Sequence, residues 1–316
     1  MAHVGSMKRD LWEEWWGYGS GTSDKHMANS SCSTSGPAFW GRHEKLFALC
    51  SMGRFQSPID IRPETLIYDP NLTTIKFQGN AINGTLHNTV HDLTLDVNYT
   101  DTTSGQFNFS SGPFSYTYRL FNVKLHLGIF NDVGSEHTIA GKQFPIEIQL
   151  MGFNSDLYRN HSEATMSTHG LAIISVLGSI DEMFNLEFDK VLTAVKNMSY
   201  KGEKQLLKNF NMLDIIPRSE MFITYEGSLT QPSCQETVTW AIVNKPMRIT
   251  KHQMASLREL NQWREGRPSL QPNNFRPPLP FNRRPVRINI SPHTEAEDCA
   301  MKITKSYTVN KRMIGS

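Results

Sequence analysis

The sequence lacks any apolar run of the roughly 18 residues that a membrane-spanning helix needs. It also lacks an excess of charge of either sign, because 32 Lys and Arg oppose 30 Asp and Glu over 316 residues, for a formal net charge of +2 at pH 7. Chains that bind nucleic acid or anionic membrane surfaces are usually far more basic. The composition therefore predicts a soluble globular protein of one large or two small domains, with neither nucleic acid nor membrane as its partner.

Cysteine is scarce, and its spacing argues against common metal-binding patterns. The four cysteines, Cys32, Cys50, Cys234 and Cys299, include no C-x-x-C pair. A zinc knuckle or a thioredoxin-like redox site is therefore not expected. Four cysteines allow three fully paired connectivities, and all three stay open at this point.

A signal peptide is also missing from the start, whose first 21 residues contain no apolar core of about 7 to 15 residues and no evident cleavage site. Eight N-x-S/T sequons nonetheless occur, where the Asn, Ser and Thr content predicts about three or four by chance. Because N-glycosylation takes place in the secretory pathway, this excess predicts a secreted glycoprotein whose natural leader precedes the given start. The alternative is a chance scatter of triplets. The sequons begin at Asn29, Asn71, Asn83, Asn98, Asn108, Asn160, Asn197 and Asn289.

Short segments that alternate apolar and polar residues recur between turn signals from about residue 39 to residue 290. This pattern predicts a mixed α/β, mainly β fold whose sheet is predominantly antiparallel. Only residues 186–198 and 250–263 have helical periodicity, so few helices are expected. The predicted strands are TTIKFQG, HDLTLDVNYT, GQFNFS, NVKLHLG, IEIQLMGF, LAIISVLG, MFITYEG, VTWAIVN and VRINI.

The chain divides into three regions by composition. Residues 1–37 combine a Trp cluster with a run rich in Ser, Gly and Thr, which predicts an irregular lead-in. Residues 38–291 hold the predicted strands and form the folded domain. Residues 292–316 carry several basic side chains and no acid after Asp298, and we expect them to be a flexible basic tail.

One predicted strand, FNVKLHLG over residues 121–128, places Lys124 and His126 on the same face, because alternate residues of a strand share a face. The strand IEIQLMGF presents Glu147 and Gln149 on one face in the same way. A catalytic zinc needs three neutral or anionic protein ligands and an open position for water. Lysine, with a reference pKa of about 10.4, is cationic unless strongly desolvated. Only the histidine and the glutamate of this set are therefore good zinc ligands.

Six motifs together resemble the α-class carbonic anhydrase family, in the family's order and spacing, over about residues 16–290. They are QSPIDI (56–61), YRLFNVKLHLG (118–128), GSEHTIAGKQFPIEIQLMGFN (134–154), GLAIISVLG (170–178), FITYEGSLTQP (222–232) and NNFRPPLPFNRR (273–284). The resemblance implies a large central twisted sheet with short peripheral helices. It also implies a zinc site in which three histidines hold the metal and a water takes the fourth position.

The resemblance places the three zinc-ligand positions at Lys124, His126 and Gln149, so only one histidine remains. We therefore expect the zinc cofactor, and with it the hydration of CO2, to be lost. Our hypothesis is that the Lys124 ammonium takes the place of the metal and hydrogen-bonds toward Gln149 and Glu147. The alternative is a residual zinc-dependent carbonate dehydratase that uses His126, Glu147 and some third ligand.

Other positions of the catalytic machinery are retained. By resemblance, Thr230 would orient a zinc-bound hydroxide, Glu136 would accept its proton, and His91 falls at or next to the proton-shuttle position. The apolar wall of the substrate pocket would comprise Met151, Ile173, Leu229 and Trp240. Without a metal these roles are vestigial. The competing interpretation is a Glu136–Thr230 hydrogen bond that ties loops to the sheet, an ordinary core, and a surface imidazole at His91.

The resemblance also pairs two of the cysteines, because Cys50 and Cys234 match the disulfide of secreted family members. Two unpaired buried thiols are the alternative. Cys299, in the tail, has no partner in the family core. An intermolecular disulfide, a bond to Cys32 and a free thiol all stay open for it.

A basic residue, a histidine and a glutamine at the three ligand positions, together with that cysteine pair, most closely resemble the inactive carbonic-anhydrase-related proteins ten and eleven. The resemblance implies a secreted pseudoenzyme that acts as an extracellular binding protein or ligand for a neural cell-surface receptor. It implies neurexin, at the synapse, as the partner. An extracellular scaffold without a specific receptor is a further alternative.

Overall fold

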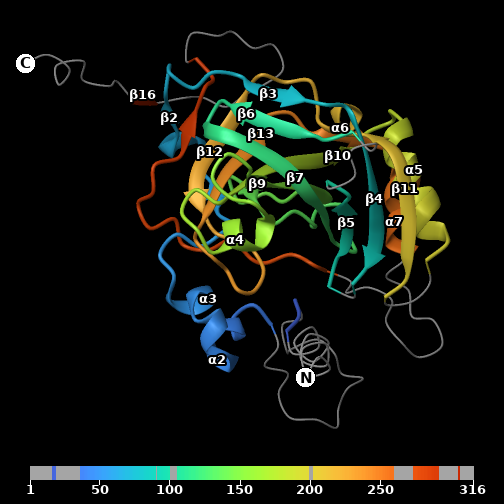
Figure 1. Cartoon of the computed structure of the whole chain (residues 1–316), viewed down its shortest axis with the longest axis horizontal. Coiled ribbons are helices and arrows are strands. Elements are labelled where there is room, and N and C mark those ends of the chain that lie inside the picture. Colours follow the sequence, from blue (N-terminus) through green and yellow to red (C-terminus); the bar gives the residue numbers. More distant parts are fainter. Residues whose placement is uncertain are drawn as a thin grey trace, which may run out of the picture.

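A 14-stranded sheet dominates the computed structural model, which describes residues 16–18, 36–89, 91–99, 105–198, 202–259, 273–291 and 305–306. Its strands follow the order β11-β4-β5-β7-β9-β10-β13-β12-β15-β2-β16, and β3, β6 and β14 join from the side (Figure 1). The long central pairs β5–β7, β7–β9 and β9–β10 are antiparallel, whereas β10–β13 and β15–β2 are parallel. The predicted fold, mainly β with a large and predominantly antiparallel sheet, is confirmed.

The elements are as follows. The strands are β1 (Asp60–Ile61), β2 (Ile67–Tyr68), β3 (Ile75–Gln78), β4 (Ala81–Asn88), β5 (Leu93–Val97), β6 (Asn108–Ser111), β7 (Phe114–Leu127), β8 (Thr138–Ile139), β9 (Ile146–Asn154), β10 (Leu171–Ile180), β11 (Lys204–Asn211), β12 (Phe222–Gly227), β13 (Val238–Val243), β14 (Met247–Ile249), β15 (Arg287–Ile288) and β16 (Lys305–Ser306). The α-helices are α2 (Trp40–His43), α3 (Leu49–Met52), α4 (His161–Thr165), α5 (Leu186–Lys196), α6 (Met212–Ile215) and α7 (Lys251–Arg258), and the 3₁₀-helices are η1 (Lys45–Phe47) and η2 (Pro63–Thr65).

Alternation along the central strands separates two faces of the sheet. One face of β7, β9 and β10 carries apolar side chains such as Leu125, Ile148 and Ile174, and these pack in one buried cluster with α5 and α7. The other face carries Lys124, His126, Glu147 and Gln149, beside a second apolar cluster. The site therefore lies on the largely buried central strands of the sheet.

The two predicted helices are confirmed, with α5 covering most of 186–198 and α7 the first part of 250–263. α7 begins with a capping box, in which Thr250 and Gln253 satisfy each other's backbone N–H groups. The expectation that these are the only helical stretches is wrong, because α2, α3, α4 and α6 also form. Each has only four or five residues, too few to show a helical period in the sequence.

A few residues near each end of the chain are described. Trp16 and Tyr18, from the predicted irregular lead-in, pack against Trp40 and the Cys50–Cys234 pair. In the predicted flexible tail, β16 pairs in parallel with β2 at the edge of the sheet (Figure 1), so this short piece is ordered. No helix in the described ranges is long and apolar enough to span a membrane.

Candidate functional site

The register between strands brings the four predicted site residues together. Lys124 lies opposite Gln149, and His126 opposite Glu147, on the neighbouring strands β7 and β9. Ser175 of β10 lies opposite Gln149 on its other side. The prediction that these side chains share one face is confirmed, and all but Lys124 are buried.

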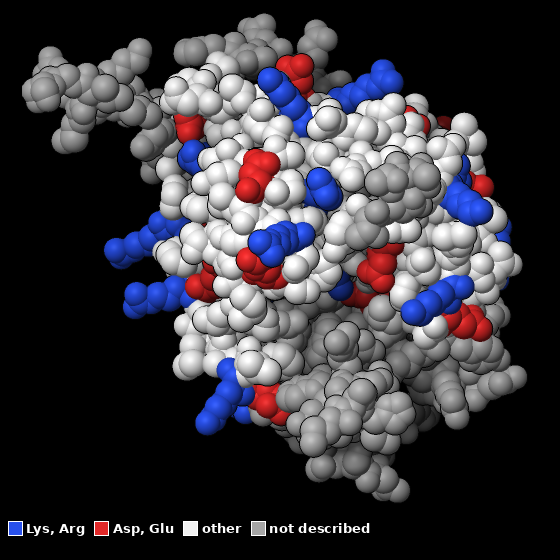
Figure 2. All heavy atoms as spheres, in the orientation of Figure 1, with Lys and Arg blue, Asp and Glu red and all other residues white. Residues whose placement is uncertain are grey.

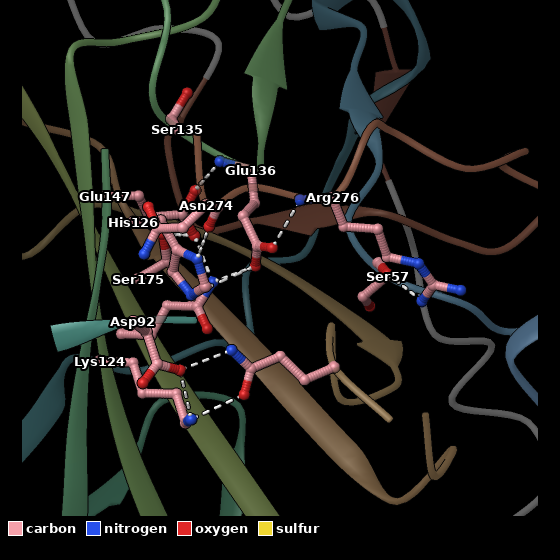
Figure 3. A network of polar contacts seen from close by, with 12 residues as sticks. Ser57, Asp92, Lys124, His126, Ser135, Glu136, Glu147, Ser175, Asn274 and Arg276 are labelled. Carbon is pink, nitrogen blue, oxygen red and sulfur yellow. Dashed lines mark hydrogen bonds and ion pairs between the residues drawn. The ribbon is translucent and has the colours of Figure 1, made fainter. Parts of the chain in front are cut away.

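Glu147 is the centre of the buried network (Figure 3). Its carboxylate accepts from the backbone N–H groups of Glu136 and His137 (both 2.9 Å), His137 Nδ1 (2.8 Å), Ser175 Oγ (2.8 Å) and Gln149 Nε2 (3.1 Å). Burial alone would raise the pKa of Glu147. The charge and hydrogen bonds of His137 outweigh burial and lower the pKa to about 2. The carboxylate is thus fully engaged in holding neighbouring segments.

His126 is held in one orientation by Asn274. Its Nδ1 lies 2.6 Å from the Asn274 carbonyl oxygen, which can only accept, so Nδ1 carries the hydrogen. The Asn274 side chain is fixed in turn by the backbone of Leu125 and Leu127, at 2.8 and 2.7 Å. The other ring nitrogen, Nε2, is buried without a hydrogen-bond partner, 3.5 Å from a Glu136 carboxylate oxygen.

Lys124 has different partners from those we predicted. Its ammonium donates to Asp92 Oδ2 (2.8 Å) and to Gln231 Oε1 (2.6 Å), so the predicted bonds toward Gln149 and Glu147 are wrong (Figure 3). The reason is that Asp92 offers a buried carboxylate without a cation of its own, whereas Glu147 is already saturated by donors. Gln231 closes the triangle with a bond to Asp92 (2.6 Å) and reaches Tyr18 Oη (2.6 Å).

The contacts with Lys124 and Gln231 keep the buried Asp92 carboxylate ionised. Burial raises its pKa, but the Lys124 ammonium and the hydrogen bonds from Gln231, Lys124 and Thr89 hold the pKa well below its usual range. A carboxylate with a depressed pKa contributes stability that is complete above its unfolded pKa of about 3.9 and is lost as the pH falls toward the folded pKa.

We therefore expect Asp92→Asn to lower the free energy of unfolding by about 3 kcal/mol at pH 7 and by progressively less as the pH falls below about 4. Urea unfolding of both proteins at pH 7, 5, 4 and 3 measures this gap. Asp181→Asn, which removes a half-exposed acid beside Arg248, is the matched control and should change little. A gap that stays constant with pH would contradict the assignment.

Glu136 and Thr230 are not joined as predicted. The Glu136 carboxylate accepts from Gln149 Nε2 (2.7 Å) and from the Arg276 backbone N–H (2.9 Å), and no hydrogen bond links it to Thr230 within the described ranges. The Gln149 amide, on β9, is buried together with the acid and donates to it. Thr230 is buried beside this network.

Arg276 ties Glu136 to the N-terminal part of the domain. It is almost fully buried, and its guanidinium donates to Gln56 Oε1 (3.0 Å) and to the carbonyl oxygens of Ser57 (2.8 Å) and Cys50 (3.0 Å). It also lies 5.4 Å from the centre of the Trp40 ring. Burial lowers the pKa of Arg276 to about 10.

His91 is buried, so the alternative of a surface imidazole is wrong. Its ring stacks on Trp16 with centroids 4.0 Å apart. Trp16 comes from the lead-in, and no pattern in the sequence predicts that it covers this loop. The four residues of the predicted apolar wall pack in one cluster: Met151, Ile173 and Trp240 belong to its buried core, and Leu229 packs against it.

The donor set does not fit the zinc that the fold implies. Lys124 has its ammonium in an ion pair, and the Gln149 amide nitrogen donates to two carboxylates. Of the three ligand positions only His126 offers an imidazole nitrogen, the kind of ligand that holds zinc in such sites. Over the described residues, no group of three or more His, Cys, Asp or Glu side chains has a metal-binding arrangement.

Cys50 and Cys234 form a disulfide, as predicted from the resemblance. Cys32 and Cys299 lie outside the described residues, and so does the sequon at Asn29. Four sequon asparagines are exposed, namely Asn71, Asn98, Asn160 and Asn197. Three are half-buried, namely Asn83, Asn108 and Asn289.

Sequence reasoning missed several residues of the site. Asp92 was detectable, since strand alternation places it on the same face as Thr94, which pairs with Lys124 across β5 and β7. Gln231 follows Thr230 directly, but nothing local assigns it to Lys124. Asn274 and Arg276 lie within one of the six motifs without a charge pattern that reveals their partners.

Comparisons with known proteins agree with this architecture. The model of the eukaryotic-type carbonic anhydrase family matches residues 35–290. A putative carbonic anhydrase-like protein 2 of Caenorhabditis elegans is 36% identical over 261 residues, which cover 81% of this chain and 77% of the relative. The chain therefore belongs to the α-carbonic anhydrase family. Within it, the chain is similar to a protein that is named carbonic anhydrase-like.

Proposed function

We propose that this protein is a catalytically inactive, carbonic-anhydrase-related pseudoenzyme. The observation that carries this is the Lys124 ammonium, bound to Asp92 and Gln231 where the family places its first zinc ligand. If a tetrahedral zinc site contributes about 10–16 kcal/mol, two missing ligands cost about 5–8 kcal/mol, or four to six orders of magnitude in affinity. Glu147, the other candidate ligand, is saturated by hydrogen-bond donors, which disfavours the residual carbonate dehydratase.

We propose further that the protein is secreted and glycosylated. A disulfide persists in oxidising compartments, and Cys50–Cys234 supports such a location. Exposed sequon asparagines on separate segments, among them Asn71, Asn160 and Asn197, can accept glycans without disturbing the core.

The proposed role is that of an extracellular binding protein for a neural cell-surface receptor. The rigid sheet would present loops and chain ends to the partner, for which neurexin is the candidate. This partner rests on the resemblance to the related proteins ten and eleven. A scaffold without a receptor would differ by the absence of saturable binding to neural surfaces.

The test is to measure zinc by elemental mass spectrometry in the purified protein, and the CO2 hydration rate on the same sample. We expect metal near zero and no rate above buffer. Zinc near one per chain with a measurable rate would restore the enzyme hypothesis. Saturable binding of the labelled protein to neurexin-expressing cells, compared with cells that lack neurexin, tests the partner separately.

A further inference from the structure

A pocket lies beside β7, β9 and the turn between β9 and α4, outside the vestigial zinc site. It has a volume of about 240 Å³ and is lined by Arg119, Phe153, Ser155, Asp156, Leu157, Tyr158 and Arg159. Arg119 belongs to β7, Phe153 belongs to β9, and the other residues form the turn between β9 and α4 (Figure 1). The pocket shares no residue with the network around Glu147.

The walls of this pocket are held in place before any ligand arrives. The Asn154 side chain accepts from the N–H groups of Asp156 and Leu157, both at 3.1 Å. Ser155 bonds the Thr117 carbonyl through its N–H (3.0 Å) and its Oγ (3.1 Å). Tyr158 Oη donates to Thr168 O at 2.7 Å. A preorganised wall lowers the entropic cost of binding.

The two guanidinium groups of the pocket are unpaired. In the described part of the chain, neither Arg119 nor Arg159 makes an ion pair or a side-chain hydrogen bond, and Arg119 Nε is buried without a partner. A buried donor of a charged group without a partner is costly, and an incoming acceptor would relieve that cost. Asp156 lies in the same wall with one oxygen bound to Thr117 N–H, so the lining keeps a formal charge of +1.

The guanidinium groups and the side chains around them indicate the chemical class of the ligand. A planar carboxylate matches the fork of a guanidinium. Beside it, the half-exposed Leu157 offers apolar surface, which suits an aliphatic side chain better than the hydroxyls of a sugar. Figure 2 shows Lys and Arg interspersed with Asp and Glu over the described part of the face that it draws.

We propose that this pocket binds the carboxylate of an acidic peptide segment, with an adjacent aliphatic side chain packed on Leu157. Arg119 and Arg159 hold the carboxylate from two sides. Within the described residues neither arginine forms an ion pair with Asp156, so both guanidinium groups are available to a ligand from outside.

Isothermal titration calorimetry on the full-length protein tests this carboxylate site. The probes are an acetylated and amidated Leu-Glu-Leu peptide and its Leu-Gln-Leu analogue. We expect saturable binding of the first, and at least tenfold weaker binding of the analogue. Arg119→Gln and Arg159→Gln should each weaken the Glu peptide about tenfold. Arg248→Gln, which removes the same charge from the exposed middle position of β14, should leave the affinity within about twofold.

Arg159 is exposed, so its variant reports on binding even if Arg119→Gln fails to fold. The Asn160 sequon adjoins the pocket, so the series is also measured with Ser162→Ala, which removes the sequon and keeps the Asn160 side chain. Three results would overturn the proposal: equal affinity for the two peptides, a loss of affinity in Arg248→Gln as large as in the pocket variants, or no saturable binding of the Leu-Glu-Leu peptide. Tighter binding of a sulfated oligosaccharide at the same arginines would also overturn it. None of these outcomes tests CO2 hydration, so failure of this proposal is distinguishable from failure of the proposed function.

Discussion

Replacing both Lys124 and Gln149 with histidine is expected to produce a zinc-binding protein. The two positions lie opposite each other on β7 and β9, on the face that carries His126. His126 already has its Nδ1 hydrogen bound to Asn274 O, which leaves Nε2 to bind a metal. Two added ligands should raise zinc affinity by about four to six orders of magnitude, from about 2.5–4 kcal/mol each.

The measurement is competition for zinc with a chromophoric chelator, followed by the visible spectrum of the cobalt-substituted protein. Lys124→His and Gln149→His alone are the controls, and each should recover about half of the gain in binding free energy. Because removal of Lys124 leaves Asp92 buried and uncompensated, the series is repeated with Asp92→Asn. A folded double variant that bound no zinc would contradict the prediction, and Tyr18, whose ring centroid lies 6.4 Å from that of His126, would then be the next residue to replace.

The face and register of the site could be predicted because they follow from local alternation. Lys124, His126, Glu147 and Gln149 each lie two residues from a partner on the same strand, and two such strands pair directly. The central strands were found for the same reason. β4 and β11 were not found, because AINGTLHN contains Asn and Gly, and β11 is interrupted by a bulge between Leu207 and Phe210.

The partners of these side chains could not be predicted, because they depend on contacts between distant parts of the chain. Gln231 lies 107 residues from Lys124, and Tyr18 lies 213 residues from Gln231. Lys124 pairs with Asp92 and not with Glu147 because other donors already occupy the Glu147 carboxylate. The Glu147 carboxylate is saturated by the backbone N–H groups of residues 136 and 137 and by three side chains, those of His137, Gln149 and Ser175. The donors from residues 136 and 137 come from a loop whose position cannot be predicted from strand alternation.

Removal of the Cys50–Cys234 disulfide is expected to be the most damaging change to stability. The bond closes a loop of 184 residues, and cross-linking a chain of that length lowers the entropy of the unfolded state by an amount worth about 5 kcal/mol on the chain-entropy model. The two half-cystines join α3 to the segment after β12. The disulfide thus holds the cluster of Trp40 and Tyr18 beside the site.

Cys50→Ser with Cys234→Ser, in urea unfolding at pH 7, measures this cost. The variant isolates the cross-link, because the bonds from Arg276 to Cys50 O and from Gln56 to Cys234 O use backbone oxygens that serine keeps. Cys32→Ser with Cys299→Ser is measured in parallel, which separates any contribution of those two cysteines from that of the Cys50–Cys234 bond, and a reductant should bring the wild type close to the Cys50→Ser, Cys234→Ser variant. A loss below about 1 kcal/mol would mean that the unfolded chain is already compact around these segments, so that the bond restricts it little.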